Sequence, residues 1–174
     1  MNRIKIAESA GFCFGVARAA QLIKAETALH RKLCTLGELI HNKSYTDALK
    51  KSGVCAVSLE EALALPAGTR VVLRTHGIPR EDAQALAQSG LSVLDATCPY
   101  VKKIHDIVMR YTADGSPLLI MGDENHPEVR GICSYAGGKC FVLSSAAQTE
   151  RFFTNLDGEI AALFAEKGPV LVSQ

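Results

Sequence analysis

Cys13–Arg18 reads CFGVAR, and 85 residues later Cys98–Lys103 reads CPYVKK, so a cysteine-led segment occurs twice in this chain. The same shift superimposes further pairs: Gly37-Glu38 on Gly122-Asp123, His41 on His126, and Cys55 on Cys140. A duplicated unit that returns a thiol and an imidazole to matching positions predicts a site shared between the two units.

The repeat continues towards the end of the chain. After a length difference of 13 residues, Arg70–His76 aligns with Pro169–Gln174, and the counterpart of His76 would be residue 175. We therefore expect the chain to end inside its second repeat, as a fragment of a longer protein.

Composition narrows the class of protein. A hydrophobic content of 48% predicts a packed core, and a net charge of +1 without a basic stripe gives no indication of a nucleic-acid partner. No signal peptide or apolar membrane span is recognisable, so we expect a cytoplasmic protein without membrane contact. In a reducing compartment the six cysteines are expected to be free thiols, ligands or catalytic groups rather than a disulfide framework.

Strand and helix patterns alternate along the chain, which predicts an α/β fold of repeated parallel units. Ile4–Ile6 is predicted as a strand and Phe14 to His30 as a helix, and short apolar runs separated by helical stretches follow. The predicted first unit spans residues 1–96 and the second, incomplete unit residues 97–174.

Polar segments follow the predicted strands, where ligands bind in parallel α/β sheets. They are Ser9–Cys13, Gly37–Asn42, Arg74–Pro79, Asp95–Pro99 and Gly122–Glu128. We expect all five to converge on one face of the molecule.

The candidate metal ligands are Cys13 and Cys98, each at a strand-to-helix turn. The positive end of a helix favours the thiolate that binds metals, and Pro99 suits a first helical position. A single cysteine is more often a small buried apolar residue, but two at matching strand ends favour a site. The other four thiols (Cys34, Cys55, Cys133 and Cys140) are interpreted as core or incidental.

Three histidines follow strands in polar loops, and they are candidate ligands of an anionic substrate: His41, His76 and His126. His30 and His105 fall within predicted helices and are interpreted as surface residues. Glu128 has no acidic counterpart in the first unit, where Lys43 stands at the matching position. This broken symmetry makes Glu128 the candidate proton donor. Its ordinary alternative is a first-turn glutamate that complements the helix dipole.

Together these motifs resemble the 4-hydroxy-3-methylbut-2-enyl diphosphate reductase family, in order and spacing, over essentially the whole chain. The matching stretches are Gly11–Val16, Gly37–Asn42, Arg74–Pro79, Asp95–Val101 and His126–Val129. The resemblance implies three α/β units in a pseudo-threefold clover around a [4Fe–4S] cluster. This chain would be an N-terminal fragment that holds two of the units, the second one incomplete, with the C-terminal third missing. Residues 1–12 then have an alternative place in the sheet of the third unit. It also implies reductive removal of an allylic hydroxyl from a diphosphate substrate, giving isopentenyl and dimethylallyl diphosphate.

By the same resemblance, Cys13 and Cys98 are two of three cluster thiolates, with the third cysteine beyond residue 174. His41, His76 and His126 contact the substrate, and Glu128 donates protons. A ferredoxin- or flavodoxin-like protein delivers electrons, and we expect the fragment as given to be inactive. Two alternatives from the residues alone remain open: a zinc-binding Cys/His protein, and an anion-binding α/β module without redox activity.

Overall fold

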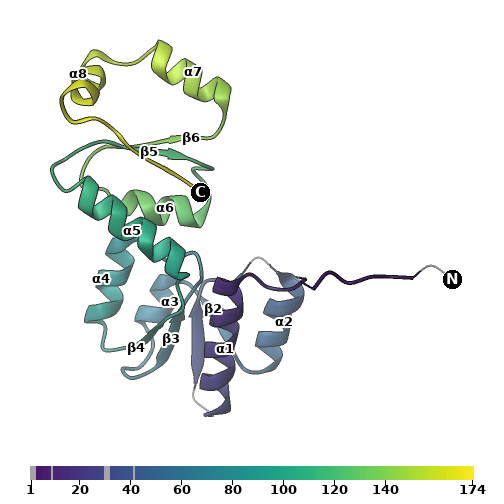
Figure 1. Cartoon of the computed structure of the whole chain (residues 1–174). Helices are drawn as coiled ribbons and strands as arrows, with labels where there is room; N and C mark the ends of the chain where they lie inside the picture. The colour runs from purple at the N-terminus through teal and green to yellow at the C-terminus, as the bar shows by residue number, and fades with distance from the viewer. Residues whose placement is uncertain (1–2, 9, 30–31, 41) are drawn as a thin grey trace.

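The computed structural model describes residues 3–8, 10–29, 32–40 and 42–174, and it contains two parallel sheets, with helices between their strands (Figure 1). The first, sheet A, has the strand order β2-β1-β3-β4, with bounds Cys55–Val57, Leu33–Leu36, Arg70–Leu73 and Ser92–Asp95. The second, sheet B, has the order β6-β5-β7, with bounds Cys140–Leu143, Leu118–Met121 and Val170–Ser173. The predicted α/β class with parallel sheets is confirmed.

Eight helices are assigned within the described ranges. They are α1 (Phe14–Ala28), α2 (Lys43–Lys51), α3 (Leu59–Leu63), α4 (Arg80–Gln88), α5 (Pro99–Tyr111), α6 (Pro127–Ser134), α7 (Ala146–Thr154) and α8 (Gly158–Lys167). Several begin where the sequence provides a cap. Ser58 and Glu61 form a capping box on α3, and Pro99 occupies the first turn of α5 as predicted.

Sheet A is covered on both faces because its strands are apolar on both sides. Ile23 of α1 joins Leu33 and Val72 in one core cluster, to which α2 also contributes. Leu86 of α4 packs with Val71 in a second cluster on the opposite face, together with α3. Burial on both faces is the usual environment of a parallel sheet.

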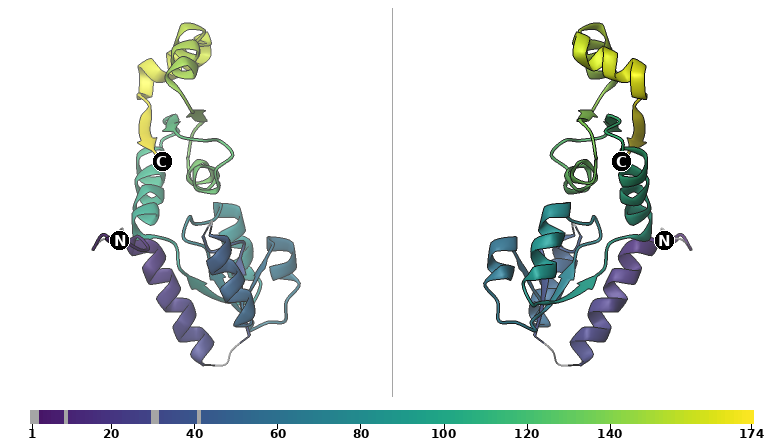
Figure 2. Two further views of the ribbon diagram at one scale, coloured as in Figure 1. Left: turned by 90° about the vertical axis from the view of Figure 1, so that its right-hand side faces the viewer. Right: turned by 90° about the vertical axis from the view of Figure 1, so that its left-hand side faces the viewer.

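Sheet B has one well-packed face. Ile120 at its centre packs against Val108 of α5 and Ile132 of α6. The other face is covered by α7 and α8, where aromatic rings such as Phe141 and Phe164 meet at centroid distances of about 6 Å. Helices α5 and α6 therefore lie between the two sheets (Figures 1 and 2).

Strand register corrects the expected repeat by one residue. Strands β1 and β5 align with the predicted shift of 85, but β2 and β6 align with a shift of 86. Cys55 pairs with Cys34, the second residue of β1, whereas Cys140 pairs with Leu118, the first residue of β5. A one-residue offset turns a side chain to the other face of a sheet, so the match of Cys55 with Cys140 is wrong.

The strand predicted at Ile4–Ile6 is also wrong. The segment belongs to neither sheet, and its isoleucine side chains are 91% and 83% exposed. In Figure 1 it extends away from the folded part, and none of the strands in the described part of the chain lies beside it. The alternative place of residues 1–12 in the sheet of a third unit stays a prediction. The boundary between units at residues 96 and 97 stays a prediction, and in the structure it falls between sheet A and α5.

Candidate functional site

The two candidate thiols begin two helices that meet. Cys13 is the N-cap of α1 and Cys98 the N-cap of α5, and neither side chain caps its own helix. The Cys98 thiol lies against the backbone of Gly15, where an added Cβ would stand 2.7 Å from Sγ. Glycine is therefore required here, and it brings the first turn of α1 onto Cys98. The N-terminal ends of these helices meet in both views of Figure 2.

Arg18 fixes the loop that carries Cys98. Its guanidinium donates to the backbone oxygens of Thr97 and Asp95, at 3.3 and 3.4 Å. The Asp95 carboxylate accepts from the Thr97 amide at 2.8 Å and pairs with Lys102 at 2.5 Å. Burial alone would raise the pKa of Asp95, but these hydrogen bonds outweigh burial and hold the pKa below its usual value.

The His76 loop is attached to the same edge of sheet A. The Cys98 amide donates to the carbonyl of Thr75 at 2.9 Å, and the Thr75 hydroxyl donates to the carbonyl of Leu39 at 3.0 Å. Three loops that follow β1, β3 and β4 are thus hydrogen-bonded to one another. This is the convergence that parallel strand ends predict.

Arg74 stabilises the loop that carries His76. Its Nε donates to the carbonyl of Gly77 at 3.1 Å, and its guanidinium lies beside Gly37, where an added Cβ would stand 3.3 Å from a terminal nitrogen. Burial lowers the pKa of Arg74, and Asp82 opposes that effect. Gly37 has φ +70°, a conformation that glycine adopts without strain.

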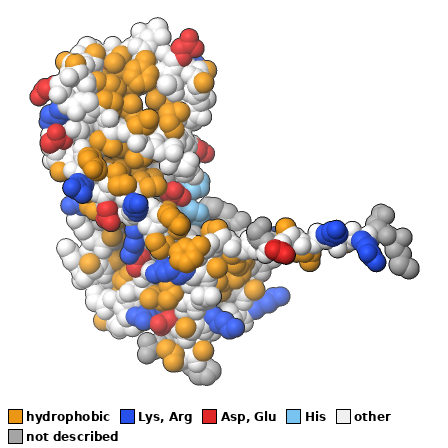
Figure 3. All heavy atoms as spheres, in the orientation of Figure 1, with side chains coloured by type: hydrophobic (Ala, Val, Ile, Leu, Met, Phe, Trp, Pro, Cys, Tyr) orange, Lys and Arg blue, Asp and Glu red, His pale blue; other side chains and the backbone are white. Residues whose placement is uncertain are grey.

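His76 and His126 come together from the two sheets. Their rings meet edge to face, with centroids 5.4 Å apart. His126 is the N-cap of α6, and its Nδ1 accepts from the Glu128 amide at 3.2 Å. Figure 3 shows histidine side chains beside an acidic group on the concave side of the molecule, between its upper and lower parts.

Glu128 is half-buried in the first turn of α6. Burial raises the pKa of its carboxyl, and the neighbouring His126 opposes that rise. A carboxyl with a raised pKa retains its proton nearer to neutral pH, as a proton donor requires.

His41 lies outside the described residues. Its neighbour Asn42 caps α2 by accepting from the Tyr45 amide at 3.1 Å. Among the described residues, no group of three His, Cys, Asp or Glu side chains lies close enough to hold one metal ion. The role of Cys13 and Cys98 as metal ligands stays a prediction. Two free thiols, one exposed and one half-buried at helix N-termini, suit a soft metal or an iron–sulfur cofactor.

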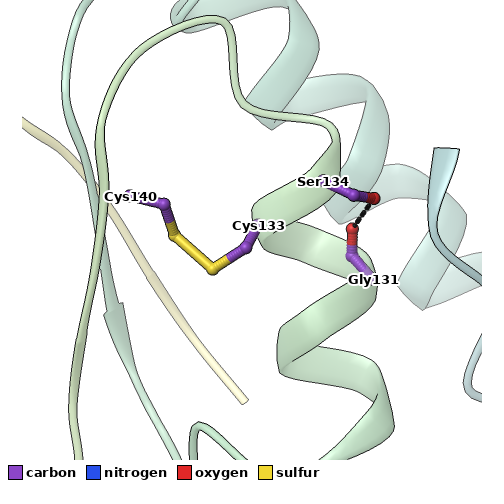
Figure 4. Close-up of a disulfide and its surroundings, with 4 residues drawn as sticks. All are labelled: Gly131, Cys133, Ser134 and Cys140. Atoms are coloured by element: carbon purple, nitrogen blue, oxygen red, sulfur yellow. Dashed lines mark hydrogen bonds between the residues drawn. A yellow bond between two sulfur atoms is a disulfide. The ribbon is translucent and has the colours of Figure 1, made fainter. Parts of the chain in front are cut away.

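The structure corrects two interpretations of side chains. Cys133 and Cys140, interpreted as core or incidental thiols, form a disulfide (Figure 4). The end of α6 and the start of β6 bring their Cα atoms to 5.8 Å, within the range that a disulfide spans. His105, interpreted as a surface residue, is only 6% exposed.

Sequence reasoning missed the residues that support the site. Arg18 and Arg74 resemble ordinary solvated arginines in the sequence, and His105 has no repeat partner. Arg18 and His105 contribute through contacts across the fold, which no local pattern marks, whereas Arg74 opens the predicted polar segment Arg74–Pro79 without a role of its own. Gly15 could have been recognised from the sequence, because a glycine in the first turn of a predicted helix indicates close contact with its backbone.

The structure thus defines a class: a parallel α/β protein of two sheets, with thiols and imidazoles gathered where strands end. The family model described as "LytB protein" matches residues 4–172, and the chain belongs to this family.

Curated relatives carry the name 4-hydroxy-3-methylbut-2-enyl diphosphate reductase. One from Caldanaerobacter subterraneus is 40% identical over 149 residues, covering 84% of this chain and 52% of the relative. One from Aquifex aeolicus is 41% identical over 185 residues, covering 92% of this chain and 62% of the relative. The chain thus spans about half to two thirds of the length of these two relatives.

Two solved structures are similar to the chain. A structure of (E)-4-hydroxy-3-methyl-but-2-enyl diphosphate reductase, the terminal enzyme of the non-mevalonate pathway, is 36% identical with a TM-score of 0.72. The match covers 98% of this chain and 66% of the reductase chain. A reductase from Plasmodium falciparum is 24% identical with a TM-score of 0.81, covering 96% of this chain and 49% of the other, and supports the fold alone. Within the described ranges, none of the helices has the length and apolar character needed to cross a bilayer.

Proposed function

We propose that this chain forms two of the three units of a cytoplasmic iron–sulfur reductase that removes the allylic hydroxyl of 4-hydroxy-3-methylbut-2-enyl diphosphate. The contact of the Cys98 thiol with Gly15 carries the proposal, because it joins two thiol-bearing helix N-termini from separate sheets. Family membership and the names of the relatives support the same reaction.

In this proposal Cys13 and Cys98 supply two thiolates to a [4Fe–4S] cluster, and a third cysteine is expected beyond residue 174. A cluster held by these thiolates would relay, one at a time, the two electrons that reductive removal of a hydroxyl requires. A ferredoxin- or flavodoxin-like protein is proposed as their source. Two protons complete the reaction, which releases the hydroxyl as water and yields isopentenyl and dimethylallyl diphosphate.

The histidines are proposed to bind the diphosphate end of the substrate. His76 and His126 converge from different units at a ring distance of 5.4 Å, so one anionic group can contact both. His41 is proposed to join them from the loop after β1. Imidazole N–H groups placed in advance bind negative charge without reorganising during the reaction.

Glu128 is proposed as the proton donor. Its half-buried carboxyl, with a raised pKa, lies next to His126, so the proton is held beside the proposed diphosphate-binding group.

Reconstitution tests the metal part of the proposal. The chain is incubated anaerobically with iron, sulfide and a small thiol that supplies the remaining ligands. We expect a brown product with absorption near ~400 nm, typical of thiolate-bound iron–sulfur clusters. Cys13→Ser and Cys98→Ser should abolish this absorption. Cys34→Ser, which removes a free thiol from β1, is the matched control and should retain it. A colourless product that contains zinc would contradict the proposal.

Calorimetry tests the substrate part. The allylic diphosphate is titrated into the same chain, with His76→Ala and His126→Ala as variants. Each variant should lower affinity by ~10-fold or more, because a hydrogen bond to a charged group contributes about 1.5–3 kcal/mol. Equal affinity in all three proteins would remove the histidines from the proposed binding site.

A further inference from the structure

His105 lies at the junction between the two sheets. It belongs to α5, is 6% exposed, and its ring stacks on that of Tyr135 at the end of α6, with centroids 4.2 Å apart and planes 18° apart. Its Nε2 is buried, and no described residue forms a hydrogen bond with this nitrogen. Burial lowers the pKa of His105, with Asp106 and Asp95 opposing that effect. Packing rather than this nitrogen holds the ring in place.

Two glycines flank the imidazole of His105. An added Cβ on Gly77 would stand 3.0 Å from its Cε1, and an added Cβ on Gly131 would stand 3.7 Å from its Nε2. Gly77 directly follows His76, and Gly131 lies in α6, the helix that begins after His126. The ring therefore fills the space between the two backbone segments that carry the histidine pair.

A hydrogen bond joins the same two segments at another point. The Arg80 amide, at the start of α4, donates to the Ser134 hydroxyl at 2.9 Å, and that hydroxyl donates to the carbonyl of Gly131 at 2.6 Å (Figure 4). This contact fixes the last turn of α6. His105 contacts the same end of the helix, beside Gly131 and through its stack on Tyr135, the C-cap of α6. The hydrogen bond and the stacked ring together hold this end of α6 against the segment that follows His76.

We propose that His105 is a positioning residue, which sets His76 against His126 by filling the gap between Gly77 and Gly131. The inference rests on the proposed function only for the role of the histidine pair. The placement of the pair is a property of the chain itself. Shortening the side chain at residue 105 should let the His76 loop and α6 move independently, since a position error of an ångström in a binding group is costly.

The test observes the histidine pair directly. The 174-residue chain is labelled with ¹³C and ¹⁵N at histidine, and cross-peaks between the His76 and His126 rings are recorded by NMR. His105→Ala should abolish these cross-peaks. His105→Phe retains a ring of similar size that can stack on Tyr135, and it should preserve them.

Val108→Ala is the matched control, because Val108 is fully buried on the same helix but packs into the core of sheet B. It should lower the urea midpoint comparably to His105→Ala and leave the cross-peaks intact. Cross-peaks that persist in His105→Ala, or that vanish equally in Val108→Ala, would overturn the proposal. If His105→Ala fails to fold, Gly131→Val is the second variant, because it adds a side chain to α6 beside the His105 ring. Loss of the cross-peaks then supports the role of His105, and their retention overturns it. A chain that binds neither cluster nor substrate would leave this result unchanged.

Discussion

Sheet A and sheet B are alike in topology and unlike in how they are covered. Both faces of sheet A carry buried core clusters, formed with α1 and α2 on one side and α3 and α4 on the other. Sheet B has one such cluster, with α5 and α6. No residue of α7 or α8 is buried, and Leu171 on β7 is 65% exposed. Figure 3 shows hydrophobic side chains across this upper part of the molecule.

The difference shows which contacts hold the candidate site. The groups brought together lie at the start of α1, on the loops of sheet A and on the two helices that form the packed face of sheet B. The outer layer of α7 and α8 contributes none of them. The inner face of sheet B should therefore determine the stability of the site, and its outer face should tolerate change.

The largest effect is expected at the centre of sheet B. Ile120 is fully buried between α5 and α6, so Ile120→Ala should lower the free energy of unfolding by about 2–5 kcal/mol. Urea denaturation followed by circular dichroism measures this loss. A change below about 1 kcal/mol would show that the inner face of sheet B is loosely packed, which would contradict the expected difference between its two faces.

The next effect concerns the attachment of α1 to sheet A. Arg70 on β3 donates to both carboxylate oxygens of Glu26, at 3.0 and 2.8 Å, and both side chains are largely buried. Arg70→Met should cost about 1.5–3 kcal/mol, the usual contribution of hydrogen bonds to charged groups. The same urea titration tests it, with Lys139→Met, which breaks an exposed pair with Glu159, as the matched control. Equal losses in the two variants would contradict the difference in burial.

Asp95 and Glu128 should affect stability with opposite dependence on pH. The folded-state pKa of Asp95 is lowered, so its contribution is present above its unfolded pKa of about 3.9 and is lost as pH falls through the folded value. Asp95→Asn should therefore lower the unfolding free energy at pH 7 by about 0.5–1 kcal/mol, since its pair with Lys102 is partly exposed. The deficit should shrink on acidification. A deficit that is constant down to pH 3 would argue against this role.

For Glu128 the dependence of stability on pH has the opposite sign. Its folded-state pKa is raised by burial, so its contribution is fully present below the unfolded pKa of about 4.3 and is lost as pH rises through the folded value. Glu128→Gln should therefore leave stability unchanged at low pH and raise it at pH 7. Urea midpoints at both pH values measure this gain. A variant that is less stable at pH 7 would show that the charged carboxylate is stabilised in the folded chain.

The smallest effect is expected on the outer face of sheet B. Leu171→Ser should change the free energy of unfolding by no more than about 0.5 kcal/mol, because the side chain is already mostly in solvent. A loss as large as that of Ile120→Ala would erase the distinction between the two faces.

Local pattern predicted much of this fold. Apolar runs such as Leu118–Met121 became strands at the expected residues, and Cys98-Pro99 began a helix as a proline in the first turn indicates. Parallel topology then predicted that the loops after β1, β3 and β4 would meet, and hydrogen bonds from Cys98 and Thr75 join them. These features depend on residues near one another in sequence, or on a general rule of sheets.

Other features depend on contacts that no local pattern records. Ile4–Ile6 has the composition of a strand, but pairing needs a partner strand, and the segment remains exposed. His105 was interpreted as a surface residue because it falls within a predicted helix and has no repeat partner, whereas the packing of two glycines and Tyr135 buries it. The repeat of Cys55 and Cys140 failed because a shift by one residue between strands is invisible in an ungapped alignment.

The most direct test of the central claim asks whether Cys13 and Cys98 lie together. A short bifunctional thiol reagent is applied to the reduced chain, and the cross-linked peptides are identified by mass spectrometry. The contact of Cys98 with Gly15 predicts a Cys13–Cys98 cross-link as a principal product, lost in Cys13→Ser and retained in Cys34→Ser. A folded chain in which Cys98 links only to other cysteines, or to none, would contradict the shared thiol site.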